Sequence, residues 1–258
     1  MPKISAIIIT LNEEKFIGRC LESLKDIADE VVVVDSYSTD STEEICRNHN
    51  AKFIRHAFEG YVEQKNYALT HAVYPLVLSL DADEAVSDEL KKSILKIKED
   101  PQCDGYFFNR FNNYYGKWIR QSRWYPDRHL RLFNPSKGKW IGPNPHDRFI
   151  LNPGCRSGRL RGNVLHWTYS SIEEHADQIN RFSTIAAGEY FKAGKKATFF
   201  TGPIHMIWSF VRSYILKAGF LDGHIGHVHC FISAYGSYLK YSKLRRLIVQ
   251  AGKTEKQS

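Results

Sequence analysis

The segment Leu76-Val-Leu-Ser-Leu-Asp-Ala-Asp-Glu84 decides the fold. Its first five residues form a short apolar run, which predicts a strand buried on both faces. The acidic residues after Leu80 predict a polar edge where this strand ends. Strands buried on both faces belong to parallel sheets that helices cover, so we expect the neighbouring sequence to alternate between strands and helices.

The residues on either side of this segment show that alternation. Short apolar runs predict strands, and apolar residues at helical spacing predict helices. The expected strands are 4–10, 31–34 and 52–55, and the expected helices are 13–24, 41–49, 61–71 and 87–98. The pattern predicts the α/β fold class, with a mostly parallel sheet flanked by helices.

The pattern changes after Gly105, where aromatic and basic residues mix with glycine and proline. Short strands and loops are expected there, including a loop over a site at 138–145. Helical spacing returns at 172–193. Two amphipathic C-terminal helices are expected between 203 and 248, separated by Gly219-Phe-Leu-Asp-Gly223.

The composition is that of a basic globular protein. The chain has 258 residues, 43% of them hydrophobic and 25% charged, and its formal net charge is +8. The segment from Arg110 to Arg161 contains twelve Lys or Arg residues but only two acidic residues, Asp127 and Asp147. Such a patch attracts phosphate-bearing partners, whether nucleotide, nucleic acid, anionic lipid or phosphorylated glycan.

The cysteines and the N-terminal residues indicate in which cellular compartment the protein is expected. The five cysteines lie far apart and form no C-x-x-C pair, so neither a disulfide framework nor a zinc site is expected. The first residues run directly into a predicted strand, without the features of a secretory signal. We therefore expect a cytoplasmic protein.

Polar clusters follow three of the predicted strands. They are Thr10-Leu-Asn-Glu-Glu14, Asp35-Ser-Tyr-Ser-Thr-Asp40 and Asp81-Ala-Asp-Glu84. Ligands bind beyond the carboxyl ends of the strands in such sheets, so these residues are candidates for a binding site. No G-x-G-x-x-G follows the first strand and no P-loop motif occurs, which argues against dinucleotide and P-loop sites.

Asp81 and Asp83 are the strongest single feature. Two carboxylates one residue apart at a strand end are expected to point the same way and to address one divalent cation or the diphosphate that it holds. Mg²⁺ or Mn²⁺ would suit such ligands and would neutralise a diphosphate leaving group. The alternative is that the triplet is an N-cap for the helix expected at 87–98.

Four motifs stand in order along the first ninety residues: Ser5-Ala-Ile-Ile-Ile-Thr-Leu-Asn-Glu-Glu14, Val31-Val-Val-Val-Asp-Ser-Tyr-Ser-Thr-Asp-Ser-Thr42, Gln64-Lys-Asn66 and Leu80-Asp-Ala-Asp-Glu84. Together they resemble glycosyltransferase family 2, whose members are inverting enzymes of the GT-A fold. The resemblance implies that fold, a nucleotide-diphosphate sugar donor such as a UDP-sugar, and a divalent metal.

The rest of the chain resembles a narrower branch, the lipopolysaccharide core β-1,4-glucosyltransferases. The motifs that carry this likeness are Arg128-His-Leu-Arg-Leu-Phe-Asn134, His146-Asp147, His166-Trp-Thr-Tyr169 and Gly219–Gly223. Relatives more often have His-Glu at the second motif, so Asp147 departs from the pattern and shortens the reach of the carboxylate by one methylene.

These resemblances imply roles for individual residues. Thr10, Asn12 and Glu14 would contact the nucleoside, Asp35 the uracil or ribose, Lys65 the base or diphosphate, Asp81 the ribose side, with Ala82 between the two acids, and Asp83 the metal. His166 is expected to be a further metal ligand or a core histidine. The guanidinium groups of Arg128 and Arg131 suit a diphosphate or a phosphorylated acceptor.

An inverting transfer is a single displacement, so one general base must deprotonate the attacking hydroxyl. We expect Asp147 to be this base, and the alternative is that Asp147 only pairs with its neighbour Arg148. The domain assignment is a catalytic domain at 1–200, with a nucleotide-binding half at 1–100 and an acceptor half at 101–200, followed by a helical extension at 201–258.

The expected function is transfer of a hexose, glucose from UDP-glucose, to a lipopolysaccharide core or related anionic cell-surface glycan. A metal-dependent nucleotidyltransferase is the alternative among enzymes, but these usually carry a Gly-rich phosphate loop near the N-terminus. A basic nucleic-acid-binding protein is another alternative, although acidic clusters at the strand ends would repel a phosphate backbone. A non-catalytic scaffold would leave Asp81 and Asp83 without a role.

The two C-terminal helices each have one apolar face, and neither is long and apolar enough to span a bilayer. One interpretation is that these faces close over the core or form an oligomer. The other is that they lie on the cytoplasmic face of the inner membrane, with basic residues facing anionic headgroups. Those basic residues are Lys240, Lys243, Arg245 and Arg246.

Overall fold

The computed structural model describes residues 2–142 and 147–254. Contacts divide the chain into two compact units. The sheet unit comprises residues 1–111 and 127–167, and the helical unit comprises residues 112–126 and 168–258. These units reflect packing, whereas the predicted division at residue 200 concerns function and stays a prediction.

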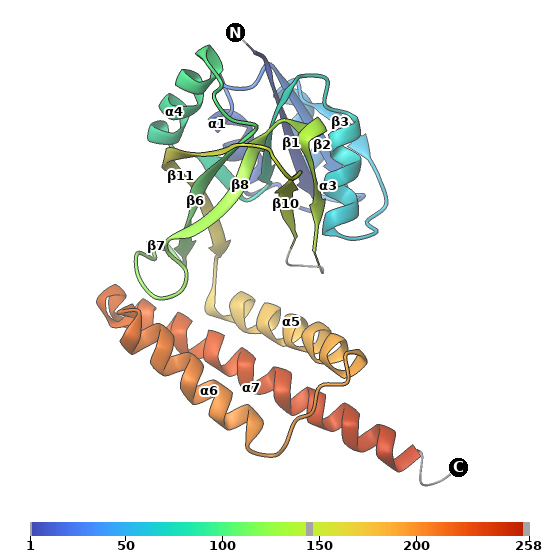
Figure 1. Ribbon diagram of the computed structural model, residues 1–258, viewed down its shortest axis with the longest axis vertical. Coiled ribbons are helices and arrows are strands. Elements are labelled where there is room, and N and C mark those ends of the chain that lie inside the picture. The colour runs from blue at the N-terminus through green and yellow to red at the C-terminus, as the bar shows by residue number, and fades with distance from the viewer. Residues whose placement is uncertain (1, 143–146, 255–258) are drawn as a thin grey trace. The chain divides into compact units, whose positions relative to one another are not determined.

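A mixed sheet forms the centre of the sheet unit (Figure 1). Its strands lie in the order β3-β2-β1-β4-β8-β6-β11-β5. The first four strands are parallel, whereas β8 is antiparallel to both β4 and β6. The bounds are β1 Ile4–Thr10, β2 Glu30–Asp35, β3 Lys52–Arg55, β4 Leu76–Asp81, β5 Glu84–Val86, β6 Gly105–Tyr114, β8 Asp127–Phe133 and β11 Ser157–Tyr169.

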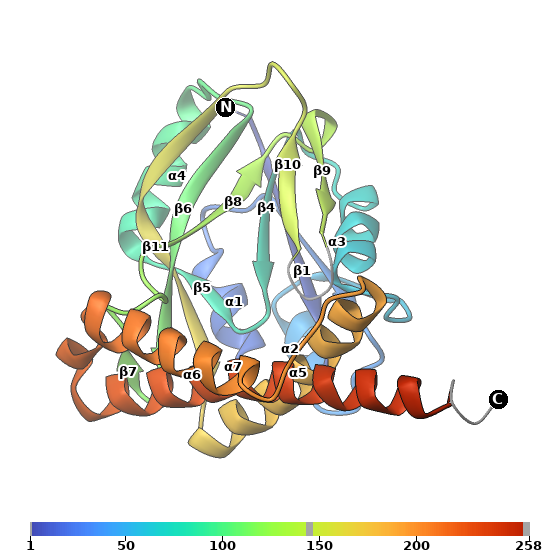
Figure 2. The ribbon, with the colours of Figure 1, turned by 60° about the horizontal axis from the view of Figure 1, so that its bottom comes forward.

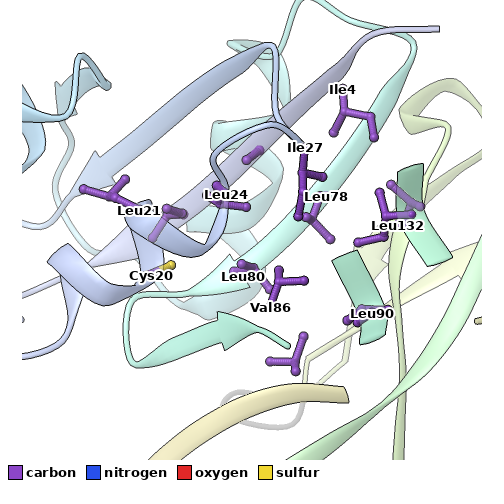
Figure 3. Close-up of a cluster of buried hydrophobic side chains, with 14 of the residues drawn as sticks. Ile4, Cys20, Leu21, Leu24, Ile27, Leu78, Leu80, Val86, Leu90 and Leu132 are labelled. Atoms are coloured by element: carbon purple, nitrogen blue, oxygen red, sulfur yellow. The ribbon is translucent and has the colours of Figure 1, made fainter. Parts of the chain in front are cut away.

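Helices cover both faces of the parallel strands, as the sequence predicts (Figure 1). They are α1 Ile17–Ser23, α2 Thr42–Asn48, α3 Tyr61–Thr70 and α4 Asp88–Glu99. On one face, Ile8 of β1 packs in a fully buried cluster with Leu24 and with Leu90 of α4 (Figure 3). On the other face, its neighbour Ile7 packs with Ala68 of α3. Burying each large aliphatic side chain contributes about 1.5–3 kcal/mol to the stability of this packing. The parallel strands with helices on both faces confirm the α/β prediction.

A two-stranded hairpin packs beside α3 and β8. It consists of β9 Gly138–Ile141 and β10 Arg148–Leu151, and Figure 2 shows β9 between α3 and β10. The predicted loop at 138–145 is therefore wrong for its first four residues. Gly138 is extended, and a Cβ there would lie 2.2 Å from the carbonyl oxygen of Ile150, so close approach of two strands requires this glycine rather than a turn.

The helical unit contains three long helices, and α7 packs against the other two. They are α5 Ile172–Lys192, α6 Thr201–Phe210 and α7 Gly223–Thr254. A π-helical turn at Val211–Leu216 and a 3-10 turn at Gly219–Asp222 join α6 to α7. The carboxylate of Asp222 accepts hydrogen bonds from the backbone N–H groups of Arg120 (3.2 Å) and Gln121 (3.0 Å). The Gly219–Gly223 motif thus ties the 112–126 segment, which includes β7 Lys117–Trp118, to the helices.

Buried tyrosines and histidines fill the interior of the helical unit. The hydroxyl of Tyr114 lies 3.1 Å from Nδ1 of His175, and the ring of Tyr169 stacks on His175 with centroids 4.3 Å apart. Trp124 lies against His229 at 4.8 Å. Burial lowers the pKa of both histidines to about 4, so both are neutral near pH 7.

Candidate active site

The carboxyl ends of three parallel strands meet at one edge of the sheet. Thr10 of β1 pairs with Asp35 of β2, and Ile9 pairs with Asp81 of β4. The predicted polar clusters are therefore neighbours in space. This placement follows from parallel pairing, which brings equivalent ends of adjacent strands together.

Lys65 joins this edge to the second half of the sheet unit. It lies on α3, is 2% exposed, and its Nζ is 2.9 Å from Oδ1 of Asp81 and 2.8 Å from Oδ2 of Asp147. Asp147 thus pairs with Lys65, and the alternative of a pair with Arg148 is wrong. The buried ammonium donates a hydrogen bond to Asp147 and is neutralised further by the charge of Asp81.

Arg131 of β8 is the second cation in this cluster. Its Nη2 lies 3.1 Å from Oδ2 of Asp81. Burial alone would raise the pKa of Asp81, but Lys65 and Arg131 outweigh it and hold that pKa well below its usual range. The ring of Trp140 lies 4.7 Å from the Lys65 ammonium and 5.4 Å from the Arg131 guanidinium, which places both cations within reach of its π face.

The two predicted arginines of β8 differ in burial, and an irregularity of the strand falls at Arg131. The pairing of β8 with β6 shifts register between Tyr106 and Phe107, so Leu130 and Leu132 pack in different apolar clusters. A β-bulge of this kind re-aims side chains locally. Arg131 is buried beside Asp81, whereas Arg128 is exposed.

Asp83 and His166 form a separate pair. Nε2 of His166, on β11, lies 3.1 Å from Oδ2 of Asp83. Within the described residues the two carboxylates have different partners, because β4 ends at Asp81 and Asp83 lies in the following turn, where strand alternation no longer applies. Their joint action on one cation, or on the diphosphate that it holds, stays a prediction. The N-cap alternative is wrong, since the hydroxyl of Ser87 caps α4 by accepting from the N–H of Leu90 at 3.4 Å.

The donor atoms of Asp83 and His166 fit two ligands of a divalent cation. A carboxylate oxygen and an imidazole nitrogen suit Mn²⁺, and Mg²⁺ accepts the carboxylate. Within residues 2–142 and 147–254, no group of three or more His, Cys, Asp or Glu side chains converges as a metal site. Further ligands would have to come from a diphosphate and water, as Mg²⁺ sites commonly have.

The predicted nucleoside contacts lie in two loops that bind one another. The side-chain oxygen of Asn12 accepts the N–H of Thr39 at 2.8 Å, and Glu14 accepts the N–H of Ser41 at 3.0 Å. Asp35 is 1% exposed and accepts the N–H of Ser38 at 2.8 Å. These three side chains therefore shape the loops.

Two predicted residues remain at this edge. The hydroxyl of Thr10 is buried and has no hydrogen-bond partner in the part of the chain that the structure describes. Ala82 is 4% exposed and packs in the core cluster of α1 and α4. His146 of the His146-Asp147 motif lies outside the described residues.

Three further residues of the site stand in the sequence motifs but had no individual role predicted. Glu84 is buried and accepts the N–H of Asp81 at 2.9 Å, which fixes the strand end. Asn66 exchanges two hydrogen bonds with the backbone of Trp140, at 3.1 and 3.2 Å. Gln64 is fully buried and donates to the hydroxyl of Ser36 at 3.1 Å. The run Gln64-Lys-Asn66 was the available signal, because three consecutive polar residues on a helix cannot all face water.

The chain is similar to known proteins over most of its length. The family model "Glycosyl transferase family 2" matches residues 5–157. An uncharacterized glycosyltransferase of Rickettsia typhi is 34% identical, over 97% of this chain and 89% of the relative. The lipopolysaccharide core biosynthesis glycosyltransferase LpsC of Rhizobium meliloti is 28% identical, over 94% of this chain and 95% of the relative.

A solved structure is also similar in part. It is glucosyl-3-phosphoglycerate synthase from Mycobacterium tuberculosis in complex with Mn²⁺, UDP and glucosyl-3-phosphoglycerate. The match is 22% identical, covers 43% of this chain and 44% of the other, and has a TM-score of 0.37.

Proposed function

The chain belongs to glycosyltransferase family 2, and on this premise we propose that it transfers a hexose, glucose from UDP-glucose, with inversion. The proposed acceptor is a lipopolysaccharide core or a related cell-surface glycan. The likeness to LpsC over most of both chains supports this acceptor class. Family membership favours this activity over the nucleotidyltransferase, nucleic-acid-binding and scaffold alternatives.

The bridge that Lys65 makes between Asp81 and Asp147 carries the proposal. It brings the predicted base next to the strand edge where the donor is expected to bind. In the transfer, Asp147 takes the proton of the acceptor hydroxyl. At the same time the hydroxyl oxygen of the acceptor bonds to the anomeric carbon of the donor sugar, and the bond from that carbon to the diphosphate breaks. Attack from the face opposite the leaving group inverts the configuration.

The cations of the cluster complete this mechanism. Lys65 and Arg131 would stabilise the charge that develops on the departing diphosphate. Asp83 and His166 would hold the divalent metal, which supplies further neutralisation of that charge. Thr10, Asn12, Glu14 and Asp35 would shape the nucleoside pocket, directly or through the loops that they fix.

A donor panel tests this function. UDP-glucose, UDP-galactose and GDP-mannose would be incubated with the full chain and Mn²⁺, Mg²⁺ or chelator, and release of the nucleotide would be measured with and without a core-oligosaccharide acceptor. We expect metal-dependent release from UDP-glucose that the acceptor stimulates. Asp147→Asn should lower acceptor-stimulated release roughly 10²- to 10⁴-fold with donor affinity nearly unchanged, while the exposed Asp100→Asn should not.

Release from none of the donors would contradict the proposed activity. Loss of donor affinity in Asp147→Asn would instead place Asp147 in the nucleotide site, and the base would then be another residue.

We propose further that the helical unit binds the cytoplasmic membrane surface. Ile204, Ile207 and Trp208 of α6 are 62%, 64% and 55% exposed. Residues 194–221 contain four basic residues and no acidic one, which suits an anionic surface. In the described ranges no helix has the length and apolarity needed to cross a membrane.

The structure corrects one part of the membrane prediction. Lys243 does not face outward, because its ammonium donates to α5 at Asn180, Ser183 and Thr184 over 2.6–2.8 Å. The exposed Arg245 and Arg246 remain available. Sedimentation with anionic liposomes at low salt should fall in Ile207→Ser but not in a matched control, Ile150→Ser, whose side chain is exposed on β10. Equal sedimentation of both variants would contradict this surface.

A further inference from the structure

A hollow opens in the sheet unit beside the Lys65 cluster. It has a volume of about 630 Å³ and lies along β8, the β9–β10 hairpin and the residues after β10. Arg128, Arg131 and Arg148 line it, together with Trp140, Phe107 and Phe149. Figure 2 shows the strands that carry these residues side by side.

The charge of this hollow is uniformly positive. Three arginines line it, and none of the described residues on its wall is acidic. Arg128 and Arg148 are exposed, and neither forms an ion pair with a residue in the described ranges. Guanidinium groups that no carboxylate of the described residues neutralises favour an anionic ligand.

Two buried donors on the same wall lack an acceptor. Nη1 of Arg131 and Nε1 of Trp140 have no hydrogen-bond partner among residues 2–142 and 147–254, and the two residues are 6% and 2% exposed. A buried donor without an acceptor is unfavourable, and native structures rarely leave one unexplained. Both atoms are shielded from solvent, so a ligand in the hollow would meet Arg128 and Arg148 rather than these two groups.

Part of the wall is aromatic, and aliphatic and small polar residues form the rest. Phe149 stacks on Phe133 with ring centroids 3.5 Å apart, and Trp140 lies edge-on to both. Rigid aromatic faces beside hydrogen-bond donors suit a ligand with an apolar face and polar substituents. A sugar that carries a phosphate or a carboxylate has both properties.

The position of the hollow connects it to the reaction. Arg148 directly follows Asp147, the proposed base, and Arg131 reaches both Asp81 and the hollow. Because β8 is antiparallel to β4, its first residues lie at the edge where β4 ends. We propose that this hollow binds the anionic group of the acceptor, a phosphate or carboxylate on the glycan, through Arg128 and Arg148. This inference rests on the proposed function and deepens it.

Binding of small anionic sugars tests the inference without turnover. The full chain would be saturated with UDP and Mn²⁺, so that added ligands cannot occupy the nucleotide site, and titrated with glucose 6-phosphate, glucuronate, glucose or inorganic phosphate by calorimetry. We expect glucose 6-phosphate or glucuronate to bind more tightly than glucose, and the stronger of the two identifies the anionic group. Arg128→Gln and Arg148→Gln should each weaken that binding about tenfold.

Arg159→Gln is the matched control, because Arg159 is an exposed arginine of the same unit that does not line the hollow. It should change the affinity less than about twofold. Equal weakening in the control would show general surface charge and overturn the inference, as would the absence of binding by either anionic sugar.

Two further readouts separate the remaining outcomes. A matching loss of UDP affinity in Arg128→Gln and Arg148→Gln would assign the hollow to the donor diphosphate and would also overturn the inference. Thermal unfolding of each variant shows whether it folds. Failure of the proposed transferase activity appears in the donor panel instead, so the two failures are distinguishable.

Discussion

The two units of this chain bury different kinds of polar cluster. The sheet unit gathers ionised groups at its strand edge, where Lys65 and Arg131 neutralise Asp81 and Asp147. The central cluster of the helical unit is neutral, with His175 between tyrosines and its pKa far below neutrality, and the buried carboxylate of Asp222 accepts backbone N–H groups instead of a cation. Buried ions are costly to assemble and rarely the best way to stabilise a core. Their concentration at one edge therefore indicates binding of a charged ligand, whereas the neutral cluster indicates packing.

The largest expected effect comes from removing Asp83, a charge whose proposed role is to bind the metal and not to stabilise the fold. Asp83→Ala is expected to lower transfer about 10³-fold, because the developing charge on the diphosphate loses its stabilisation. Stability should change little, since the Asp83 side chain is 26% exposed. Kinetic assay beside chemical unfolding measures both effects. Near wild-type turnover would show that the metal assignment is wrong.

Lys65→Met tests whether the charged cluster depends on mutual neutralisation. It leaves Asp81 and Asp147 without their shared cation, so we expect the free energy of unfolding to fall by about 3–5 kcal/mol. Lys25→Met is the control, because Lys25 forms an exposed pair with Glu22 at 2.6 Å, and exposed pairs contribute about 0–1 kcal/mol. Similar losses in both variants would remove the distinction between the cluster and an ordinary surface.

Acidification should affect the helical unit first. Burial lowers the pKa of His175 and His229 from 6.5 to about 4, so between these values the unfolded chain binds protons that the folded chain excludes. The stabilisation is complete above pH 6.5 and is lost as the pH falls toward 4. Each histidine accounts for roughly 3 kcal/mol across that window.

The sheet unit offers the contrast to this pH dependence. Although burial would raise it, hydrogen bonds from His129 and charge from Arg110 lower the pKa of Asp127 to about 2. The stabilising effect of that carboxylate is complete above its ordinary pKa of 3.8 and is lost as the pH falls toward 2. Between pH 7 and 4 the hydrogen-exchange protection factors, corrected for the intrinsic exchange rate at each pH, should therefore fall in α5 before they fall in β1. A simultaneous fall in both elements would contradict the difference between the units.

The smallest expected effect comes from one hydroxyl of the neutral cluster. Tyr114→Phe removes the hydrogen bond to Nδ1 of His175, at 3.1 Å. Loss of one neutral buried hydrogen bond should lower the free energy of unfolding by about 1 kcal/mol. Tyr115→Phe, whose ring is 55% exposed, is the neighbouring control. A loss as large as that of Lys65→Met would show that the neutral cluster is not merely packing.

The sheet edge could be predicted from sequence, and much of the contact network there could not. The strand ends of β1, β2 and β4 were predictable because apolar runs end at Thr10, Asp35 and Asp81, and parallel pairing brings such ends together. The Lys65–Asp147 pair joins residues 82 apart, and no local pattern encodes such a contact. Family resemblance named both residues without predicting that they touch.

Local irregularities limit what spacing alone can predict. Asp81 and Asp83 are two residues apart, but the strand ends at Asp81, so the two carboxylates have different partners within the chain. The register shift between Tyr106 and Phe107 falls at Arg131 of β8, and bulges leave no reliable mark in a single sequence. Gly138 was interpreted as a turn residue because close approach between strands and positive φ favour the same amino acid.

Adjacent residues of α3 give that helix a wider role than its length suggests. Lys65 contacts the donor edge and Asp147, and Asn66 binds the backbone of Trp140 in the hairpin that leads to Asp147. The donor edge and the proposed base Asp147 are thus both positioned by α3. A substitution that displaces α3 by a fraction of an ångström alters both spacings together, so neither side of the site is free to drift from the other.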